Sequence, residues 1–291
     1  MKVCPQCFEC ALKQARTTAQ YVTDDENLIT AVLQETARRV AEASTSLSPA
    51  EFSMAAYDSV RERLGVLDPY LEQKKKFNAV AVGLAERLQE RITRSSDPFR
   101  TAALLAAAGN VIDLGIGIVF DIETEIERVL REGFAVDHLE AFRKELAGSR
   151  TLLYCLDNAG EVVFDRLFVE EILRSFPSLR VTALVKGGPI INDATLDDAR
   201  EAGLDDLLEV KTTGTAAIGV PLGSVNEETI RLLSESDLIL SKGQGNFEML
   251  YGVEGNIYFL FRVKCTLAAR YLGLSVGDYL ILKNGRVKPK F

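Results

Sequence analysis

Carboxylate, amide and ammonium side chains gather in three short segments in the second half of the sequence. Each segment directly follows a hydrophobic stretch, and they read Asp157-Asn-Ala-Gly-Glu161, Lys186-Gly-Gly-Pro-Ile-Ile-Asn-Asp-Ala-Thr195 and Ser241-Lys-Gly-Gln-Gly-Asn246. Open α/β sheets bind ligands in loops at the carboxyl ends of parallel strands. Carboxylate and amide oxygens suit a hard divalent cation, and lysines suit a phosphate. The three segments therefore predict a cation and phosphate site.

The candidate metal ligands are Asp157, Asn158 and Asp193. The first two lie just past a predicted strand, 151–156, and Asp193 takes the equivalent position after the next strand, 179–185. Adjacent parallel strands lie about 4.8 Å apart, so the segments meet at one crevice if those strands are neighbours. Two carboxylates and an amide then suit Mg²⁺ or Mn²⁺. The alternative is that these residues only cap the helices that follow.

Two lysines, Lys186 and Lys242, are the candidate cations for a phosphate. The glycines beside them could bring backbone N–H groups close to a ligand. Neither loop is a Walker A sequence, and no strand runs into Gly-x-Gly-x-x-Gly, which argues against a nicotinamide or flavin cofactor. Further candidate contacts in the same loops are Asn192, Gly243 and Asn246.

A glycine-rich stretch, 109–117, interrupts the helical pattern of the first half of the sequence. Its two small polar residues, Asn110 and Asp113, stand out among apolar neighbours. The stretch is either a buried turn between helices or a loop that reaches the active site. On the second interpretation both residues are candidate substrate contacts.

The chain begins with a cysteine motif, Cys4-Pro-Gln-Cys7-Phe-Glu-Cys10. Two Cys-x-x-Cys steps suggest a soft-metal or redox site. A ferredoxin-type cluster would need a further cysteine soon after, but position 14 is Gln14. Cys155 or Cys265 could complete a site only if the fold brings them close. Residues three apart also share one helix face, so simple burial is the alternative.

Composition excludes several classes of protein. The chain has 291 residues, 47% of them hydrophobic, and a formal net charge of −8, whereas nucleic-acid binding proteins usually carry a basic excess. No apolar run approaches the roughly 20 residues that span a bilayer, and the start lacks a signal-peptide core. We therefore expect a cytoplasmic protein without nucleic-acid or membrane partners. The only histidine, His138, leaves no multi-histidine zinc site.

The pattern of elements changes near residue 150. Residues 1–148 are rich in Ala, Leu, Glu and Arg at helical spacing, and Ser48 and Glu51 form a capping box. Residues 149–291 alternate short strands with helices, which predicts a mostly parallel sheet. We predict an amino-terminal all-helical domain, 1–148, followed by a Rossmann-like three-layer α/β domain, 149–291, that binds metal and phosphate.

The chain resembles the damage-control phosphatase family, which has an ARMT-like domain, over nearly its whole length. The resemblance rests on the three segments described above, on Cys-Pro-Gln-Cys at residue 4 and on Gly-Asn-Val-Ile-Asp at residue 109. It points to the prokaryotic-type subfamily with an amino-terminal Cys-x-x-Cys. It implies a metal-dependent phosphatase of small phosphorylated metabolites. The ligands that it implies are Asp157, Asn158 and Asp193 for the metal, Lys242 for the phosphate, and also Asn192 and Lys186.

These inferences predict a hydrolase that cleaves phosphomonoesters with a divalent metal: Mg, Mn, Co or Ni. The attacking group is a metal-bound water or the Asp157 carboxylate, and the candidate general acids are Asp113, Glu161 and Asp237. Sugar phosphates, damaged nucleotides and phosphorylated cofactor fragments all remain candidate substrates. The alternative function is a non-catalytic or redox protein that binds zinc or an iron–sulfur cluster through Cys4, Cys7 and Cys10.

Overall fold

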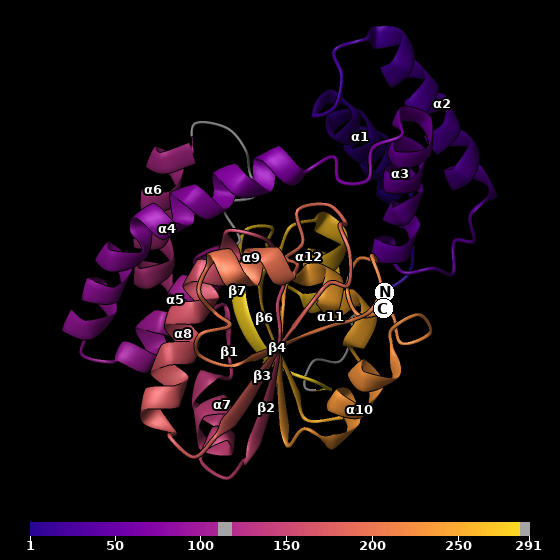
Figure 1. Ribbon diagram of the computed structural model, residues 1–291. Coiled ribbons are helices and arrows are strands. Elements are labelled where there is room, and N and C mark those ends of the chain that lie inside the picture. Colours follow the sequence, from indigo (N-terminus) through magenta and orange to yellow (C-terminus); the bar gives the residue numbers. More distant parts are fainter. Residues whose placement is uncertain (110–117, 286–291) are drawn as a thin grey trace.

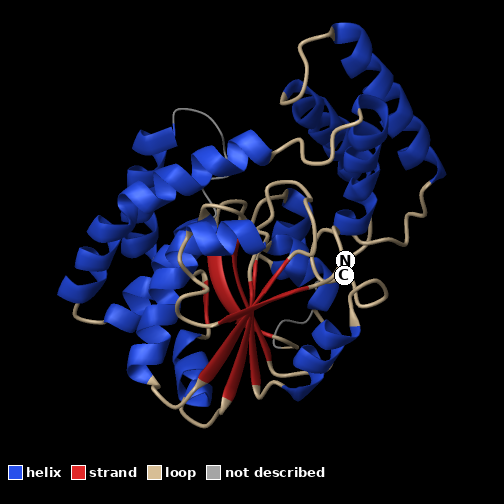
Figure 2. Ribbon diagram, in the orientation of Figure 1, coloured by secondary structure: helices blue, strands red, loops and turns tan. Residues whose placement is uncertain are grey.

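The core of the molecule is a seven-stranded sheet with helices on both sides (Figures 1 and 2). The computed structural model describes residues 1–109 and 118–285. The strand order is β1-β7-β6-β5-β2-β3-β4, and every pair is parallel except β6 and β7. The strands are β1 (Val136–Asp137), β2 (Thr151–Cys155), β3 (Arg180–Val185), β4 (Glu209–Thr212), β5 (Leu238–Lys242), β6 (Ile257–Arg262) and β7 (Tyr279–Lys283).

Successive residues of the strands enter two different hydrophobic cores. In β2, Leu152 and Tyr154 belong to one core, and Leu153 and Cys155 to the other. Side chains alternate between the faces of a sheet, so a strand that is covered on both faces reads as a continuous apolar run. The predicted three-layer, mostly parallel α/β architecture is therefore confirmed.

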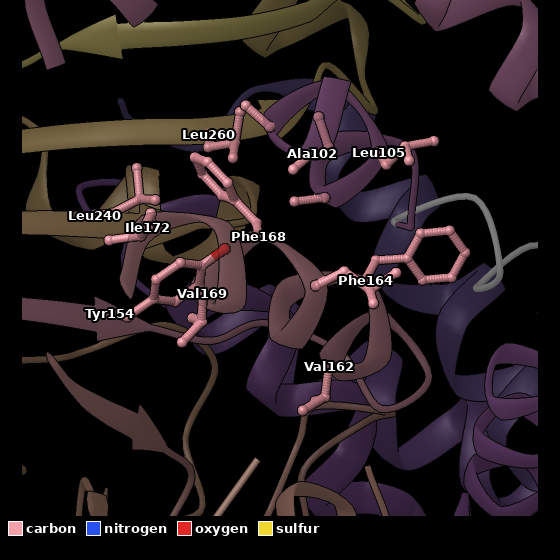
Figure 3. Packing of buried hydrophobic residues seen from close by; sticks show 14 of the residues in the cluster. Ala102, Leu105, Tyr154, Val162, Phe164, Phe168, Val169, Ile172, Leu240 and Leu260 are labelled. Atoms are coloured by element: carbon pink, nitrogen blue, oxygen red, sulfur yellow. The ribbon is translucent and has the colours of Figure 1, made fainter. Parts of the chain in front are cut away.

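The first face of the sheet is covered mainly by α5 and α8, which pack closely on each other (Figure 3). Small residues such as Ala102 on α5 leave room for large ones on α8, among which Phe168 points toward Leu260 of β6. The helices whose residues enter this core are α4 (Leu71–Arg94), α5 (Pro98–Ala108), α6 (Ile118–Glu132), α7 (Leu139–Leu146), α8 (Glu161–Ser175) and α9 (Leu196–Glu201).

The second face is covered by a smaller group of helices around the buried ring of Phe247. This ring contacts Phe259 and Phe261 of β6, with ring centroids 5.2 and 5.0 Å apart. The helices of this layer are α10 (Glu227–Glu235), α11 (Gln244–Leu250) and α12 (Thr266–Leu272).

The first three helices form a separate unit with small cores of their own, and Figure 1 shows them beside the sheet rather than on one of its faces. Ala15, Ala19 and Ala56 are fully buried there, so the helix axes can approach closely. Ser48 and Glu51 form the predicted capping box. This three-helix unit consists of α1 (Pro5–Gln20), α2 (Glu26–Glu42) and α3 (Pro49–Leu64).

Elements on the amino-terminal side of residue 148 also take part in the packing of the sheet. Helices α4 and α5 share the main hydrophobic core with the sheet, and the short strand β1 pairs with β7. A two-residue strand has no sequence periodicity from which it could be predicted. The predicted domain boundary at residue 148 stays a prediction.

None of the helices in the described residues is long and apolar enough to cross a membrane.

Candidate active site

The polar segments meet because their strands are neighbours. In the sheet β2 lies between β3 and β5 and runs parallel to both, with Cys155 level with Leu184 and with Ser241. The segments that follow these strands therefore leave the same edge of the sheet. This is the arrangement on which the predicted crevice depended.

Asp157, Asn158 and Asp193 come together as one group, which we call the oxygen cluster. Asn158 and Asp193 form an isolated β-bridge, and the Ala194 N–H donates to the Asp157 carbonyl over 2.7 Å. The Asn158 amide nitrogen donates to Asp157 Oδ2 over 2.8 Å and to Glu161 Oε2 over 3.2 Å. All three cluster residues are at least 93% buried, so backbone pairing between the two loops fixes their relative positions.

The environment of Asp157 disfavours its negative charge. Burial raises the pKa of Asp157 to about 8, and the Glu161 and Asp193 carboxylates contribute in the same direction. The Lys264 and Lys186 ammonium groups lower that pKa. Several acidic groups thus share one buried space, which is a place where a cation stabilises the ionised forms.

The donor set of the oxygen cluster fits a hard divalent cation, because it consists of two carboxylates and one amide. Among residues 1–109 and 118–285, no group of three or more His, Cys, Asp or Glu side chains is placed to hold a metal ion. A cation in the oxygen cluster would therefore depend on the amide oxygen of Asn158, and on water, for its remaining ligands.

Gly243 sets the position of the Asp157 carboxylate. Its φ is +81°, and a Cβ built on it would lie 2.1 Å from Asp157 Cγ. No other residue type leaves room for the carboxylate. We expected this glycine to let the backbone come close to a ligand. In the structure it lets the backbone come close to the Asp157 carboxylate of the cluster.

Lys186 lies behind the cluster. Its Nζ donates to the Gly219 carbonyl over 2.6 Å and to Asn246 Oδ1 over 3.2 Å, and lies 3.5 Å from Asp193 Oδ2. The side chain is only 2% exposed. Lys186 thus supplies positive charge to Asp193 from inside the protein.

Lys242, which the sequence predicts to bind phosphate, is buried among groups of the protein. Its Nζ lies 2.9 Å from Glu161 Oε1 and 2.5 Å from Asp165 Oδ1, and donates to the Ala106 carbonyl over 2.9 Å. Burial opposes its charge, but Asp165 and Glu161 outweigh burial and raise the pKa of Lys242. A fully buried ammonium with these partners is not placed to contact phosphate in the cavity described below. The sequence could not show this, because Lys242 lies 81 and 77 positions from Glu161 and Asp165 in the chain.

The remaining predicted residues take several positions. Asn246 is fully buried and its amide nitrogen donates to the carbonyls of Leu156 and Lys242, so it ties the ends of β2 and β5 together. Asp237 lies at the opposite edge of the sheet, where it accepts from the N–H of Thr151, and so cannot be the general acid. Asn192 lies in the wall of the cavity described next. Asn110 and Asp113 fall outside the described residues.

The oxygen cluster opens into a cavity of about 390 Å³, which we call the central cavity. Its walls come both from the three-helix unit and from the loops after β2, β3, β5 and β6. They include Asp157, Asn158, Asn192, Asp193, Gln244, Glu248, Lys264 and Cys265 from the loops and α11, and Cys4, Cys7, Cys10, Tyr21, Tyr57 and Tyr70 from the first part of the chain.

Lys264 is the functional candidate that the sequence analysis missed. It is exposed, lines the central cavity and lowers the pKa of Asp157 by its charge. It lies just past β6, so the rule that placed Asp157 and Asp193 at strand ends also applies to it. Glycines beside a lysine were the sequence signal for a phosphate loop. They are present beside Lys242 and absent beside Lys264.

The amino-terminal cysteines also reach the central cavity. Cys4 Sγ and Cys7 Sγ lie 3.7 Å apart, and Cys10 and Cys265 line the same wall. Cys155 instead belongs to the second hydrophobic core, where burial raises its pKa to about 12. The prediction of a metal or redox site on Cys4, Cys7 and Cys10 stays a prediction.

A doubly covered parallel sheet with an acidic cluster at its carboxyl edge defines a class of α/β enzymes whose ligands bind at strand ends. The model of one family, the damage-control phosphatase ARMT1-like domain, matches residues 3–280. The chain belongs to this family, and membership supports a phosphatase role. The predicted family is thereby confirmed.

Relatives match over almost their entire length. The chain is 39% identical to a damage-control phosphatase from Archaeoglobus fulgidus, over 96% of this chain and 98% of that protein. It is 33% identical to a damage-control phosphatase from Pyrococcus horikoshii, over 98% and 99%. A crystal structure of a DUF89 family protein from Pyrococcus horikoshii superposes with a TM-score of 0.90 at 33% identity, covering 98% of this chain and 99% of the other.

Proposed function

We propose that this protein is a metal-dependent phosphatase that hydrolyses phosphomonoesters of small metabolites in the central cavity. The observation that carries the proposal is the oxygen cluster, which faces the same cavity as the exposed cation Lys264. A phosphomonoester needs a cation to neutralise its oxygens and a positively charged side chain to orient it. The oxygen cluster, with its cation bound, and Lys264 would meet these two requirements in the same cavity.

Asp157, Asn158 and Asp193 would hold the divalent cation. When bound, the cation supplies Lewis-acid stabilisation of charge on the phosphoryl oxygens. Its positive charge would also keep Asp157 ionised despite burial, because an adjacent cation lowers the pKa of a carboxyl group. Whether Mg²⁺, Mn²⁺, Co²⁺ or Ni²⁺ serves best is left to the experiment below.

Lys264 replaces Lys242 as the proposed phosphate partner. It is exposed at the cavity and therefore reaches an incoming anion, whereas Lys242 is fully buried. We assign Lys242 a positioning role. Its ion pair with Glu161 holds a carboxylate that accepts from Asn158, and so fixes the orientation of the cluster amide.

The size and lining of the central cavity favour a small substrate. Its volume, about 390 Å³, lies within the range of pockets for small molecules. The three-helix unit and the segment after it contribute the rings of Tyr21, Tyr57 and Tyr70 to the lining. These rings would contact the part of the substrate that carries the phosphate, as expected for a sugar phosphate, a damaged nucleotide or a phosphorylated cofactor fragment.

The test is hydrolysis of p-nitrophenyl phosphate by metal-stripped protein to which Mg²⁺, Mn²⁺, Co²⁺ or Ni²⁺ is returned. We expect activity only with metal, and none in Asp157→Asn or Asp193→Asn. Asp237→Asn is the matched control, because that carboxylate lies at the other edge of the sheet. Full activity without metal, or in both cluster variants, would contradict the proposal.

A further inference from the structure

Four of the five cysteines line the central cavity, and the proposed phosphatase reaction uses none of them. Cys4, Cys7 and Cys10 come from the start of α1, and Cys265 follows Lys264 at the end of β6. The two parts are in contact, because the Thr266 hydroxyl donates to Gln6 Oε1. A small molecule that enters the cavity therefore meets a wall rich in thiols.

Within this wall Cys4 and Cys7 form a close pair. Cys4 is the N-cap of α1 and Cys7 lies one helical turn later. Their sulfurs are 3.7 Å apart, and the Cys4 N–H lies 3.4 Å from Cys7 Sγ. A disulfide bond is about 2.05 Å long, so the sulfurs must approach by roughly 1.7 Å. Both residues lie in one turn, so side-chain rotation can supply this movement without separating packed elements.

A pair of thiols at this spacing suits disulfide chemistry better than metal binding. A structural zinc site needs four protein ligands, most often cysteine and histidine. In the described part of the chain, no group of three or more Cys, His, Asp or Glu side chains is placed to hold a metal ion. Two sulfurs within side-chain reach are sufficient for a disulfide, and Cys-x-x-Cys is a spacing that redox-active dithiols use.

We propose that Cys4 and Cys7 form a redox-active dithiol that exchanges with small disulfides entering the central cavity. The Cys4 thiolate attacks one sulfur of the incoming disulfide, which breaks its S–S bond and releases one thiolate. Cys7 then attacks the Cys4 sulfur of the mixed disulfide and releases the second thiolate. The two protons of Cys4 and Cys7 leave on the two released thiols, and two electrons pass from the cysteines to the incoming disulfide.

The surroundings assign the order of attack. Burial raises the pKa of the Cys7 thiol to about 11; the hydrogen bond from the Cys4 N–H lowers this pKa, and the nearby Cys4 and Cys265 thiols raise it. The hydrogen bond from the Cys4 N–H holds the Cys7 sulfur beside Cys4, where it can attack the mixed disulfide, and the raised pKa keeps it protonated until the departing thiolate can accept its proton. Cys4 is the attacking sulfur and Cys7 the resolving one.

The test uses full-length protein equilibrated with mixtures of reduced and oxidised glutathione, followed by alkylation of free thiols and intact-mass measurement. We expect the number of alkylated thiols to fall by two, with peptide mapping that joins Cys4 to Cys7. Cys10→Ser is the matched control and should behave as the wild type, whereas Cys4→Ser and Cys7→Ser should not lose two thiols. Mapping needs only the wild-type protein, so misfolding of a variant cannot hide the result.

Three results would overturn the proposal. One is retention of all five thiols in the most oxidised mixture, and another is a disulfide that joins Cys265 to α1 instead. The third is zinc uptake that protects Cys4, Cys7 and Cys10 together from alkylation, which would identify a metal site. None of these measurements uses phosphatase activity, so their outcome is independent of the proposed function.

Discussion

At the scale of single residues, the site depends on how tightly its carboxylates are held. Asp157 is fixed on one side by the Asn158 amide and on another by the backbone of Gly243. These contacts leave the Asp157 carboxylate little freedom to move when a neighbouring group is shifted. Small changes beside it should therefore affect catalysis more than stability.

Gly243→Ala should lower kcat/KM by about 100-fold, because a misplacement of about 1 Å in a catalytic geometry has that effect. The new Cβ would overlap Asp157 Cγ and force the carboxylate away. The control is Gly252→Ala. Gly252 has a similar φ of +86° but no neighbour within 4 Å, so this variant carries the backbone strain alone. Equal activity losses in both variants would assign the effect to strain and not to Asp157.

Lys264→Ala should lower kcat/KM about 10- to 100-fold, since a hydrogen bond to a charged group contributes about 1.5–3 kcal/mol. Lys264 is exposed, so the melting temperature should stay unchanged. Lys264→Arg should recover part of the activity because it retains the charge. Steady-state kinetics with the activating metal would check this, and unchanged kinetics in Lys264→Ala would remove Lys264 from the phosphate site.

At the scale of elements, Lys242 joins three of them. It lies at the end of β5 and contacts Asp165 and Glu161 of α8 and the carbonyl of Ala106 in α5. Tyr154 of β2 adds to this network by donating to Asp165 over 2.7 Å. The buried network therefore fixes α5 and α8 against the sheet just behind the oxygen cluster.

Lys242→Met should lower the free energy of unfolding by about 3–5 kcal/mol, because it leaves two buried carboxylates without their partner. The control is Lys75→Met, which removes an exposed ion pair with Glu72 and should leave the free energy of unfolding nearly unchanged. Urea denaturation would measure both. A stable Lys242→Met protein with only a raised KM would restore the phosphate role that the sequence suggested.

At the scale of the whole molecule, the central cavity exists only because the three-helix unit is held against the α/β part. One link is the Ala50 N–H, which donates to Glu248 Oε2 over 2.8 Å. Glu248 lines the cavity, and burial raises its pKa to about 7. This link should therefore make stability depend on pH.

Glu248 has a higher pKa in the folded protein, about 7, than its ordinary value of 4.5. The folded state therefore binds more protons between these values, and the contribution of Glu248 to stability falls as pH rises through that window. Glu248→Gln keeps an acceptor for Ala50 but does not titrate. Its free energy of unfolding should gain on that of the wild type from pH 4.5 to pH 7, as measured by urea denaturation. A constant difference across the window would contradict this.

The sequence by itself determined the alternation of strands and helices, and it identified Asp157, Asn158 and Asp193 as a cluster. It could do so because continuous apolar runs in short strands indicate a parallel sheet that is covered on both faces. The carboxyl ends of neighbouring parallel strands also lie at the same edge of the sheet, so the polar residues that follow them come together. Only the tertiary structure showed that Lys242 is buried whereas Lys264 is exposed at the cavity. It also showed that Cys265 lies near the amino-terminal cysteines. Lys242 ends β5 and Lys264 lies just past β6, but whether such a side chain faces solvent or a buried carboxylate depends on the helices packed against it. Such contacts join residues far apart in sequence, and no local pattern records them.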